Sequence, residues 1–133
     1  MEREGYMVKH AKVMVVEDNE TVRTLLSRIL ANAGCIAVTV SNGEHAWLMA
    51  TEDPPDLMLV DYDLPELNGA DLIQRIRHAR SEHLAKLPII GITVGADWGQ
   101  RLDVAGATVV MQKPFNLVEI IAAVRKYVRC EVC

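Results

Sequence analysis

Five short apolar runs alternate with segments of helical periodicity along the 133 residues, and this alternation constrains the fold most strongly. Apolar runs of this length, bounded by turn-forming residues, are typical of buried strands. Strands that are apolar throughout and that alternate with helices predict a parallel sheet with helices on both faces. The expected strands are residues 12–16, 35–40, 57–60, 88–93 and 108–112.

Apolar spacing and capping residues predict the helices between these strands. Ser41 and Glu44 fit a capping box before the second helix, and Asn116 and Glu119 fit another before the last. Residues 81–86 are expected to be a polar connection, and Arg77 is expected to point outward. The expected helices are residues 20–33, a segment ending near Thr51, residues 70–79, residues 96–105 and a segment after Asn116.

The length of the chain and its five strands narrow the fold further. The size suits a single domain, with a core over about residues 12–128 and flexible tails at 1–10 and 130–133. Among doubly wound α/β folds, the flavodoxin-like strand order 2-1-3-4-5 suits five strands. We therefore expect a (βα)5 three-layer sandwich in which the first and third strands are neighbours.

Charge and composition argue against several classes of protein. The net charge of −4 and the lack of a basic stripe argue against nucleic-acid binding. The sequence contains no run of 18 apolar residues, so it predicts no membrane-spanning helix. Three cysteines do not make a disulfide framework, so a cytoplasmic setting is expected. Cys130 and Cys133 have the spacing of redox or zinc sites, but without a second ligand pair we interpret them as part of the tail.

Acidic residues stand at the ends of two expected strands. Glu17 and Asp18 follow the first strand, and Asp61 follows the third, with Asp63 two residues later. Because ligands of open parallel sheets bind at the carboxyl ends of the strands, we expect these acids at one edge. Carboxylates so close together repel one another unless a cation lies among them. Oxygen ligands in a partly open site suit Mg²⁺.

A hydroxyl and an ammonium are expected at the same edge. Thr93 ends the fourth strand, and Lys113 follows the fifth. Pro114 favours an extended conformation at Lys113, which holds the lysine at the strand tip. A cation site, a hydroxyl and a lysine suit a phosphoryl group, which the Asp61 carboxylate can attack in line. The sequence therefore predicts an aspartyl phosphate at Asp61.

Together these motifs resemble the receiver domain of two-component response regulators. The resemblance covers about residues 12–128 and is carried by Glu17-Asp18, Asp61, Leu64-Pro65, Asn68-Gly69, Thr93, Ala105-Gly106-Ala107 and Lys113-Pro114-Phe115. It implies a signalling phosphoacceptor rather than an enzyme, which takes a phosphoryl group onto Asp61 from a sensor histidine kinase or a histidine phosphotransfer protein. It also implies a set of Mg²⁺ ligands: Asp18, Asp61, the backbone carbonyl of Asp63 and, through bound water, Glu17.

The same resemblance implies how the site signals. Thr93 and Lys113 would contact phosphoryl oxygens, and a shift of Thr93 would repack the surface of residues 96–105, 108–112 and the last helix. Val110 stands where the family commonly has a switch Tyr or Phe, so the signal output is expected to differ. The segment after Thr93 is about two residues shorter than usual and contains Gly99, so its helix is expected to be short, mobile or irregular.

Two further side chains are expected beside the site. Val94 is bulkier than the usual residue after Thr93, and Trp98 is expected to be exposed nearby. Because the usual output surface is altered, we expect partners to read residues 20–33 and the loops around the site.

Two alternative functions stay open at this point. Asp61-Tyr62-Asp63 has the D-x-D form of haloacid-dehalogenase-type phosphatases, although the chain leaves no room for a cap domain. A degenerate receiver that acts only as a protein-interaction module is the other alternative. The complete set of acids argues against the degenerate receiver, whereas the missing aromatic at Val110 favours it.

Overall fold

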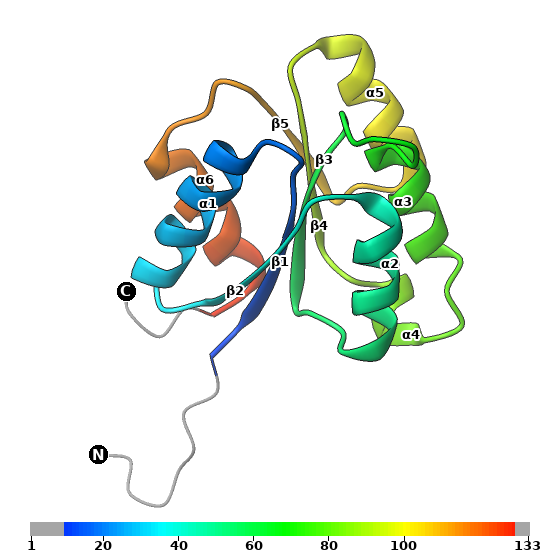
Figure 1. The fold of residues 1–133 in the computed structure, drawn as a ribbon, viewed down its shortest axis with the longest axis horizontal. Helices are drawn as coiled ribbons and strands as arrows, with labels where there is room; N and C mark the ends of the chain where they lie inside the picture. The colour runs from blue at the N-terminus through cyan, green and yellow to red at the C-terminus, as the bar shows by residue number, and fades with distance from the viewer. Residues whose placement is uncertain (1–9, 130–133) are drawn as a thin grey trace, which may run out of the picture.

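The computed structural model describes residues 10–129, which form a five-stranded parallel sheet in the order β2-β1-β3-β4-β5 (Figure 1). The predicted flavodoxin-like α/β fold is confirmed. The strands are β1 Lys12–Val16, β2 Ile36–Val40, β3 Leu57–Asp61, β4 Ile89–Thr93 and β5 Val109–Gln112. The helices are α1 Glu20–Asn32, α2 Gly43–Glu52, α3 Gly69–Arg77, α4 Glu82–Ala85, α5 Ala96–Ala105 and α6 Leu117–Tyr127.

Most of the predicted tails, with the Cys130 and Cys133 pair, lie outside the described residues. Each predicted strand and helix begins and ends within two residues of the bounds given for it above. None of the helices in the described part of the chain is long and apolar enough to cross a lipid bilayer.

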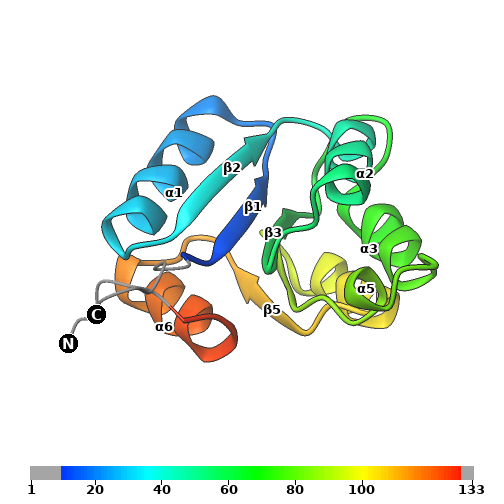
Figure 2. The same ribbon diagram turned by 90° about the horizontal axis from the view of Figure 1, so that it is seen from below.

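Helices cover both faces of the sheet, with α1 and α6 on one side and α2, α3 and α5 on the other (Figure 2). In β1, Val13 and Val15 belong to the core beneath α1 and α6, whereas Met14 and Val16 belong to the opposite core. Successive side chains of a strand point to opposite faces, so a strand buried on both faces must be apolar throughout. This is why the strands read as continuous apolar runs.

The register of the parallel strands places their carboxyl ends level. Val16 of β1 pairs with Val60 of β3, so Glu17 and Asp61, the next residue of each segment, lie side by side. Lys113 follows the last residue of β5 at the same edge. The functional residues predicted from separate motifs are therefore brought together by backbone pairing.

Asparagine side chains cap four of the described helices: Asn19, Asn42, Asn68 and Asn116. The capping box predicted at Asn116 and Glu119 is confirmed, with both reciprocal hydrogen bonds present. The box predicted from Ser41 and Glu44 is wrong. Asn42 caps α2 instead and accepts from the third helical N–H at 2.8 Å. Asparagine is at least as good a cap as serine, so the helix starts one residue later.

A short helix, α4, occupies part of the segment predicted to be a polar connection. Its cap is Ser81, whose hydroxyl accepts from the N–H of Leu84 at 3.3 Å. Leu84 is the one fully buried residue of this single turn. One apolar position gives no periodic pattern, which is why the sequence did not predict α4.

The helix expected to be short or irregular, α5, is a regular helix of ten residues. The prediction of an irregular helix is wrong, since Gly99 lies inside α5 without interrupting it, whereas the expected mobility stays a prediction. A Cβ at Gly99 would lie 3.4 Å from Thr93 Cγ2 and 3.4 Å from Val110 Cγ1. The helix ends at Gly106, whose φ of 115° lies in the left-handed region that glycine favours.

Arg77, predicted to point outward from α3, is half-buried and joins three chain segments. Its Nε donates to the carbonyl oxygen of Gly106 at 2.8 Å. Its Nη1 donates to the carbonyl oxygens of Leu87 at 2.8 Å and Ala85 at 3.2 Å. A charged guanidinium therefore ties the end of α3 to α4, to the start of β4 and to the turn after α5.

Replacing Arg77 with methionine keeps much of the aliphatic stem but removes the donors to these carbonyls. We expect the free energy of unfolding, measured by urea titration, to fall by about 2–4 kcal/mol, because part-buried acceptors lose their partners. Arg80→Met, at an exposed position just beyond the same helix, is the control and should change it by less than about 0.5 kcal/mol. Equal losses in both variants would contradict the bridging role of Arg77.

Candidate functional site

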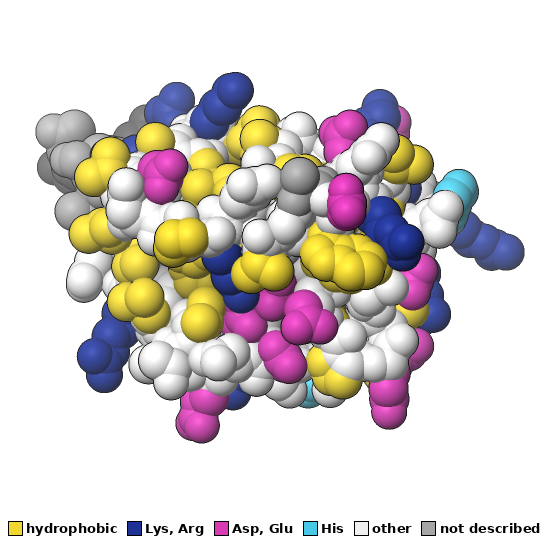
Figure 3. Space-filling view, turned by 90° about the horizontal axis from the view of Figure 1, so that it is seen from above, with side chains coloured by type: hydrophobic (Ala, Val, Ile, Leu, Met, Phe, Trp, Pro, Cys, Tyr) yellow, Lys and Arg dark blue, Asp and Glu magenta, His cyan; other side chains and the backbone are white. Residues whose placement is uncertain are grey.

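A pocket of about 830 Å³ opens at the carboxyl edge of the sheet. Figure 3 views this face, where acidic side chains gather near the middle, beside a basic one. The pocket is lined by six of the predicted site residues together with their neighbours, and these six are Glu17, Asp18, Asp61, Asp63, Thr93 and Lys113. The structure therefore brings these side chains from four strand ends into one place.

Three carboxylates form the acidic part of the pocket. Glu17, Asp18 and Asp61 each offer one oxygen, and these oxygens lie within 4.8 Å of one another. Within residues 10–129 this is the one cluster of three or more acidic, histidine or cysteine side chains with such spacing. Glu17 is 2% exposed and Asp61 is 4% exposed, whereas Asp18 is open to solvent. An oxygen-only set with one exposed member fits a hard divalent cation such as Mg²⁺, which keeps some of its own water.

Lys113 reaches into this cluster from the end of β5. Its Nζ lies 3.1 Å from Glu17 Oε1 and 3.3 Å from Asp61 Oδ2. Burial by itself would lower the pKa of Lys113, but the attraction of Asp61 and Glu17 outweighs it and raises the pKa above its ordinary value. The ammonium therefore stays charged while it bridges two buried carboxylates.

The Asp61 carboxyl resists ionisation in the protein without a cation. Burial raises its pKa from 3.8 to about 6, and the neighbouring charge of Glu17 adds to the rise. Lys113 opposes the rise through charge and a hydrogen bond but does not cancel it. The single positive charge of Lys113 does not neutralise the three carboxylates, so an additional cation would stabilise their ionised forms.

Thr93 and Asp63 complete the predicted set with weaker contacts. The Thr93 side chain is 2% exposed, and its Oγ1 lies 3.4 Å from both the N–H nitrogen and the carbonyl oxygen of Gly95. Such long contacts leave the hydroxyl available to another acceptor. The Asp63 N–H donates to Asp61 Oδ1 at 3.4 Å, while the Asp63 side chain points into solvent.

An aromatic stack at the edge of the pocket was only partly predicted. Trp98 lines the pocket as expected and is 40% exposed. Its ring stacks on Tyr62 with centroids 4.8 Å apart, and the guanidinium carbon of Arg101 lies 4.8 Å from the Trp98 ring centroid. Tyr62 was missed because no local spacing indicates its contact with Trp98, which lies far away in the sequence. Arg101 was missed although it follows Trp98 by three residues in the same helix, a spacing that places both side chains on one face.

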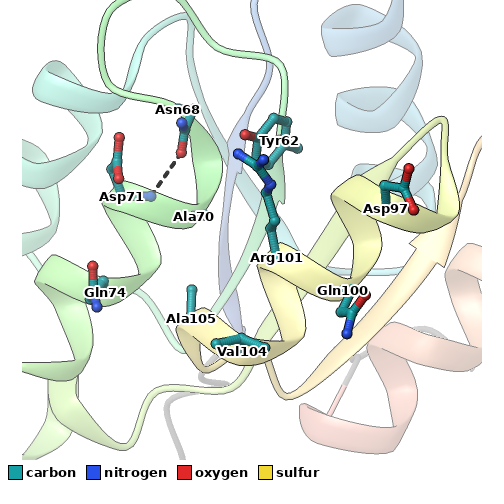
Figure 4. A pocket seen from close by; sticks show the side chains of 10 residues that line it. All are labelled: Tyr62, Asn68, Ala70, Asp71, Gln74, Asp97, Gln100, Arg101, Val104 and Ala105. Atoms are coloured by element: carbon teal, nitrogen blue, oxygen red, sulfur yellow. Dashed lines mark hydrogen bonds between the residues drawn. The ribbon is translucent and has the colours of Figure 1, made fainter.

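A second pocket of about 570 Å³ lies between α3 and α5 (Figure 4). Asn68 and Asp71 line its α3 side, and Arg101 extends from α5 toward Tyr62. Tyr62 lines both pockets, so its ring belongs to the partition between them. None of the predicted acids, Thr93 or Lys113 lines this second pocket.

Comparison with known proteins identifies the family to which this fold and site belong. Residues 13–125 match the response regulator receiver domain, so the chain belongs to this family of two-component signalling domains. Members of the family interact with histidine kinases or phosphotransfer proteins. The resemblance inferred from the motifs is therefore confirmed.

Individual relatives agree with this membership. The polar-differentiation response regulator DivK of Brucella anthropi is 30% identical over 117 residues, which cover 86% of this chain and 94% of DivK. The phosphate regulon regulator PhoB of Rhizobium meliloti is 32% identical over 120 residues, which cover 89% of this chain and 52% of PhoB.

Solved structures show the same fold. The chemotaxis response regulator CheY4 of Vibrio cholerae superposes with a TM-score of 0.83 at 25% identity, covering 90% of this chain and 100% of CheY4. The receiver domain of sensor histidine kinase PA1611 from Pseudomonas aeruginosa has a TM-score of 0.81 at 28% identity, covering 90% of this chain and 98% of that domain. The PA1611 structure holds a magnesium ion in its active site cleft.

The raised pKa of Asp61 predicts a pH-dependent stability in protein freed of divalent cations. Below about pH 4 the carboxyl is protonated in both folded and unfolded chains, so Asp61→Asn and the parent should be similarly stable. Between about pH 4 and pH 6 the unfolded parent ionises while the folded parent keeps the Asp61 proton, so the parent progressively loses stability relative to the variant, and the loss is complete above pH 6. The rise from 3.8 to about 6 sets an upper limit of about 3 kcal/mol on the difference above pH 7.

Urea titrations of the two proteins in EDTA between pH 4 and pH 8 would measure this difference. Asp63→Asn is the matched control, because the Asp63 side chain is exposed and should show no comparable trend. A variant that is no more stable than the parent at pH 8 would contradict the burial penalty at Asp61.

Proposed function

We propose that this chain is a phosphoacceptor receiver, in which Asp61 takes a phosphoryl group from a phosphohistidine of a sensor histidine kinase or a histidine phosphotransfer protein. The observation that carries the proposal is the placement of the Asp61 carboxylate in an acidic cluster, 3.3 Å from the Lys113 ammonium. A buried carboxyl without a charged partner would stay protonated, whereas a bound cation would favour the ionised form of Asp61. The cycle would belong to a cytoplasmic phosphorelay.

Each side chain in the pocket has a separate task in this proposal. The Asp61 oxygen attacks phosphorus in line with the bond to the donor nitrogen, which breaks as the new O–P bond forms. Lys113 stabilises charge on one phosphoryl oxygen, and the Thr93 hydroxyl donates to another. Lys113 would have to shift part of its contact from the carboxylates to the incoming group, which its two existing bonds permit.

A cation would be held by Asp18, Asp61 and the backbone carbonyl of Asp63, with Glu17 holding metal-bound water. A bound Mg²⁺ supplies positive charge that offsets the acids and the developing phosphoryl charge. Glu17 is already bound by Lys113 and by the N–H of Asn19 at 3.0 Å, which suits an outer ligand.

The signal would leave the site through Thr93 and through the surface near α5 and Val110. Val110 is half-buried, and its Cγ1 would lie 3.4 Å from a Cβ built on Gly99, so it faces α5. Membership in the receiver family argues against the haloacid-dehalogenase alternative, and turnover of a small phosphate ester would be needed to revive it. The complete acid, lysine and hydroxyl set argues against a degenerate receiver.

Partners that read the receiver are proposed to contact α1 and the loops around the pocket, because the usual output surface is altered. Leu25 of α1 is 53% exposed, and Leu117 at the start of α6 is 55% exposed. These two side chains line one apolar groove between the helices. Exposed apolar side chains that share a groove are typical of protein contact surfaces.

Phosphorylation by a small donor tests the proposed function directly. Incubation with Mg²⁺ and acetyl phosphate should add the mass of one phosphoryl group to the intact protein. Asp61→Asn should abolish the gain because amide oxygen is a poor nucleophile, and EDTA should abolish it in the parent. Asp63→Asn, which keeps the backbone carbonyl, should retain it. A gain of mass that survives Asp61→Asn would refute the assignment.

Trp98 provides an optical test of the same site. In a Trp47→Phe background, Trp98 is the remaining tryptophan, and it lines the pocket with Asp61. Beryllofluoride, which mimics a bound phosphoryl group, should change its emission when Mg²⁺ is present, because charge and solvent near the indole change. The response should disappear in the Asp61→Asn variant of that background. An unchanged spectrum on confirmed binding would contradict the placement of Trp98 at the pocket.

A further inference from the structure

The mouth of the pocket has two chemically different sides. Asp18 and Glu20, at the start of α1, are exposed on one side. Val94, which is 69% exposed, and Trp98, which is 40% exposed, bound the pocket on the α5 side. A molecule that delivers a phosphoryl group to Asp61 therefore meets carboxylates on one side and apolar surface on the other.

Trp98 is held firmly relative to the nucleophile. Its ring stacks on Tyr62 with an angle of 22° between the planes, and Tyr62 follows Asp61 directly in the chain. The Tyr62 ring also packs against the hydrophobic core beneath α2, α3 and α5. Gly99, the next residue of α5, lies near Thr93, because a Cβ built on it would be 3.4 Å from Thr93 Cγ2.

Arg101 supports the indole from its own helix. Its guanidinium carbon lies 4.8 Å from the Trp98 ring centroid, within the range of a cation–π contact. Figure 4 shows Arg101 extending from α5 toward Tyr62, at the partition between the two pockets. The indole is thus a positioned wall of the phosphoryl pocket rather than a loose surface side chain.

The leaving group of the donor must face this wall. In-line attack by Asp61 places the leaving group on the far side of phosphorus, toward the mouth. A phosphorylated imidazole that is protonated on its other nitrogen keeps the electron pair of the broken N–P bond and leaves as neutral imidazole. Acetyl phosphate breaks its O–P bond and leaves as acetate, an anion that the carboxylates at the mouth repel.

We propose that Trp98 is a specificity-determining residue of this site, which favours donors with a flat aromatic leaving group over acyl phosphates. Its indole gives a neutral imidazole an apolar surface to pack against, next to Val94. Tyr62 and Arg101 are positioning residues, because they act through the indole. The proposal rests on the proposed function of Asp61 as the phosphoacceptor.

The test compares two donors on the same protein. Initial rates of Asp61 phosphorylation, followed by intact mass in excess Mg²⁺, are measured with monophosphoimidazole and with acetyl phosphate. The quantity of interest is the ratio of the two rates, because damage to Asp61, to the cation site or to α5 would slow both donors alike.

Trp98→Leu keeps an apolar side chain but removes the flat ring. We expect the ratio of the imidazole rate to the acetyl rate to fall about three- to tenfold, the value of one lost aromatic contact. Trp98→Phe, which restores a ring, should recover most of the ratio. Trp47→Phe is the matched control, since Trp47 also lies near an arginine but not in this pocket, and it should leave the ratio unchanged.

Tyr62→Leu leaves the indole in the chain but removes its support, so it should lower the ratio in the same direction by a smaller factor. If Trp98→Leu does not fold, the ratio measured for Tyr62→Leu tests the specificity role of Trp98 in its place. Equal slowing of both donors in these variants would overturn the specificity role of Trp98. A parent protein that neither donor phosphorylates at Asp61 would instead refute the proposed function, so the two failures are distinguishable.

Discussion

The carboxyl edge of the sheet holds more buried negative charge than positive charge, and the properties of the site depend on this imbalance. Glu17 and Asp61 are both nearly inaccessible to solvent, and one ammonium, Lys113, lies within 3.3 Å of each. The pKa values of both Asp61 and Lys113 are raised, which means that each group holds its proton more tightly than usual. A site in this condition gains from additional positive charge, and its chemistry follows from that need.

The sheet can hold these charges because its strands are packed on both faces. Every residue of β3 is buried, including Asp61 at its end, and its neighbours β1 and β4 fix its position through parallel pairing. A rigid platform keeps the carboxylates close in spite of their repulsion. The energetic cost at Asp61 is thus met by the apolar packing of the strands that carry it.

On the α5 side, two contacts join the site to the rest of the molecule. Gly99 lies against Thr93 and Val110, and the ring of Trp98 lies against Tyr62. A Cβ at Gly99 would lie 3.4 Å from both Thr93 and Val110, an ordinary van der Waals distance, so this position faces β4 and β5 without requiring a glycine.

Much of the fold was predictable from local patterns in the sequence. The strands, most helix bounds and the cap at Asn116 follow from apolar periodicity and side-chain hydrogen bonding, which act over a few residues. The single turn of α4 has one buried side chain and therefore no period to detect. The choice between Ser41 and Asn42 as a cap depends on where the chain leaves β2, which neighbouring strands determine.

The sequence by itself determined the parallel α/β fold and the acids, hydroxyl and lysine at its strand ends. Those residues could be placed because each one follows an apolar run, and parallel strands all end at one edge. The tertiary structure alone decided that Lys113 bridges Glu17 as well as Asp61, that Arg77 turns inward, and that Tyr62 stacks on Trp98. These contacts join residues far apart in the chain, and their geometry depends on the final packing of helices on the sheet, which no local pattern encodes.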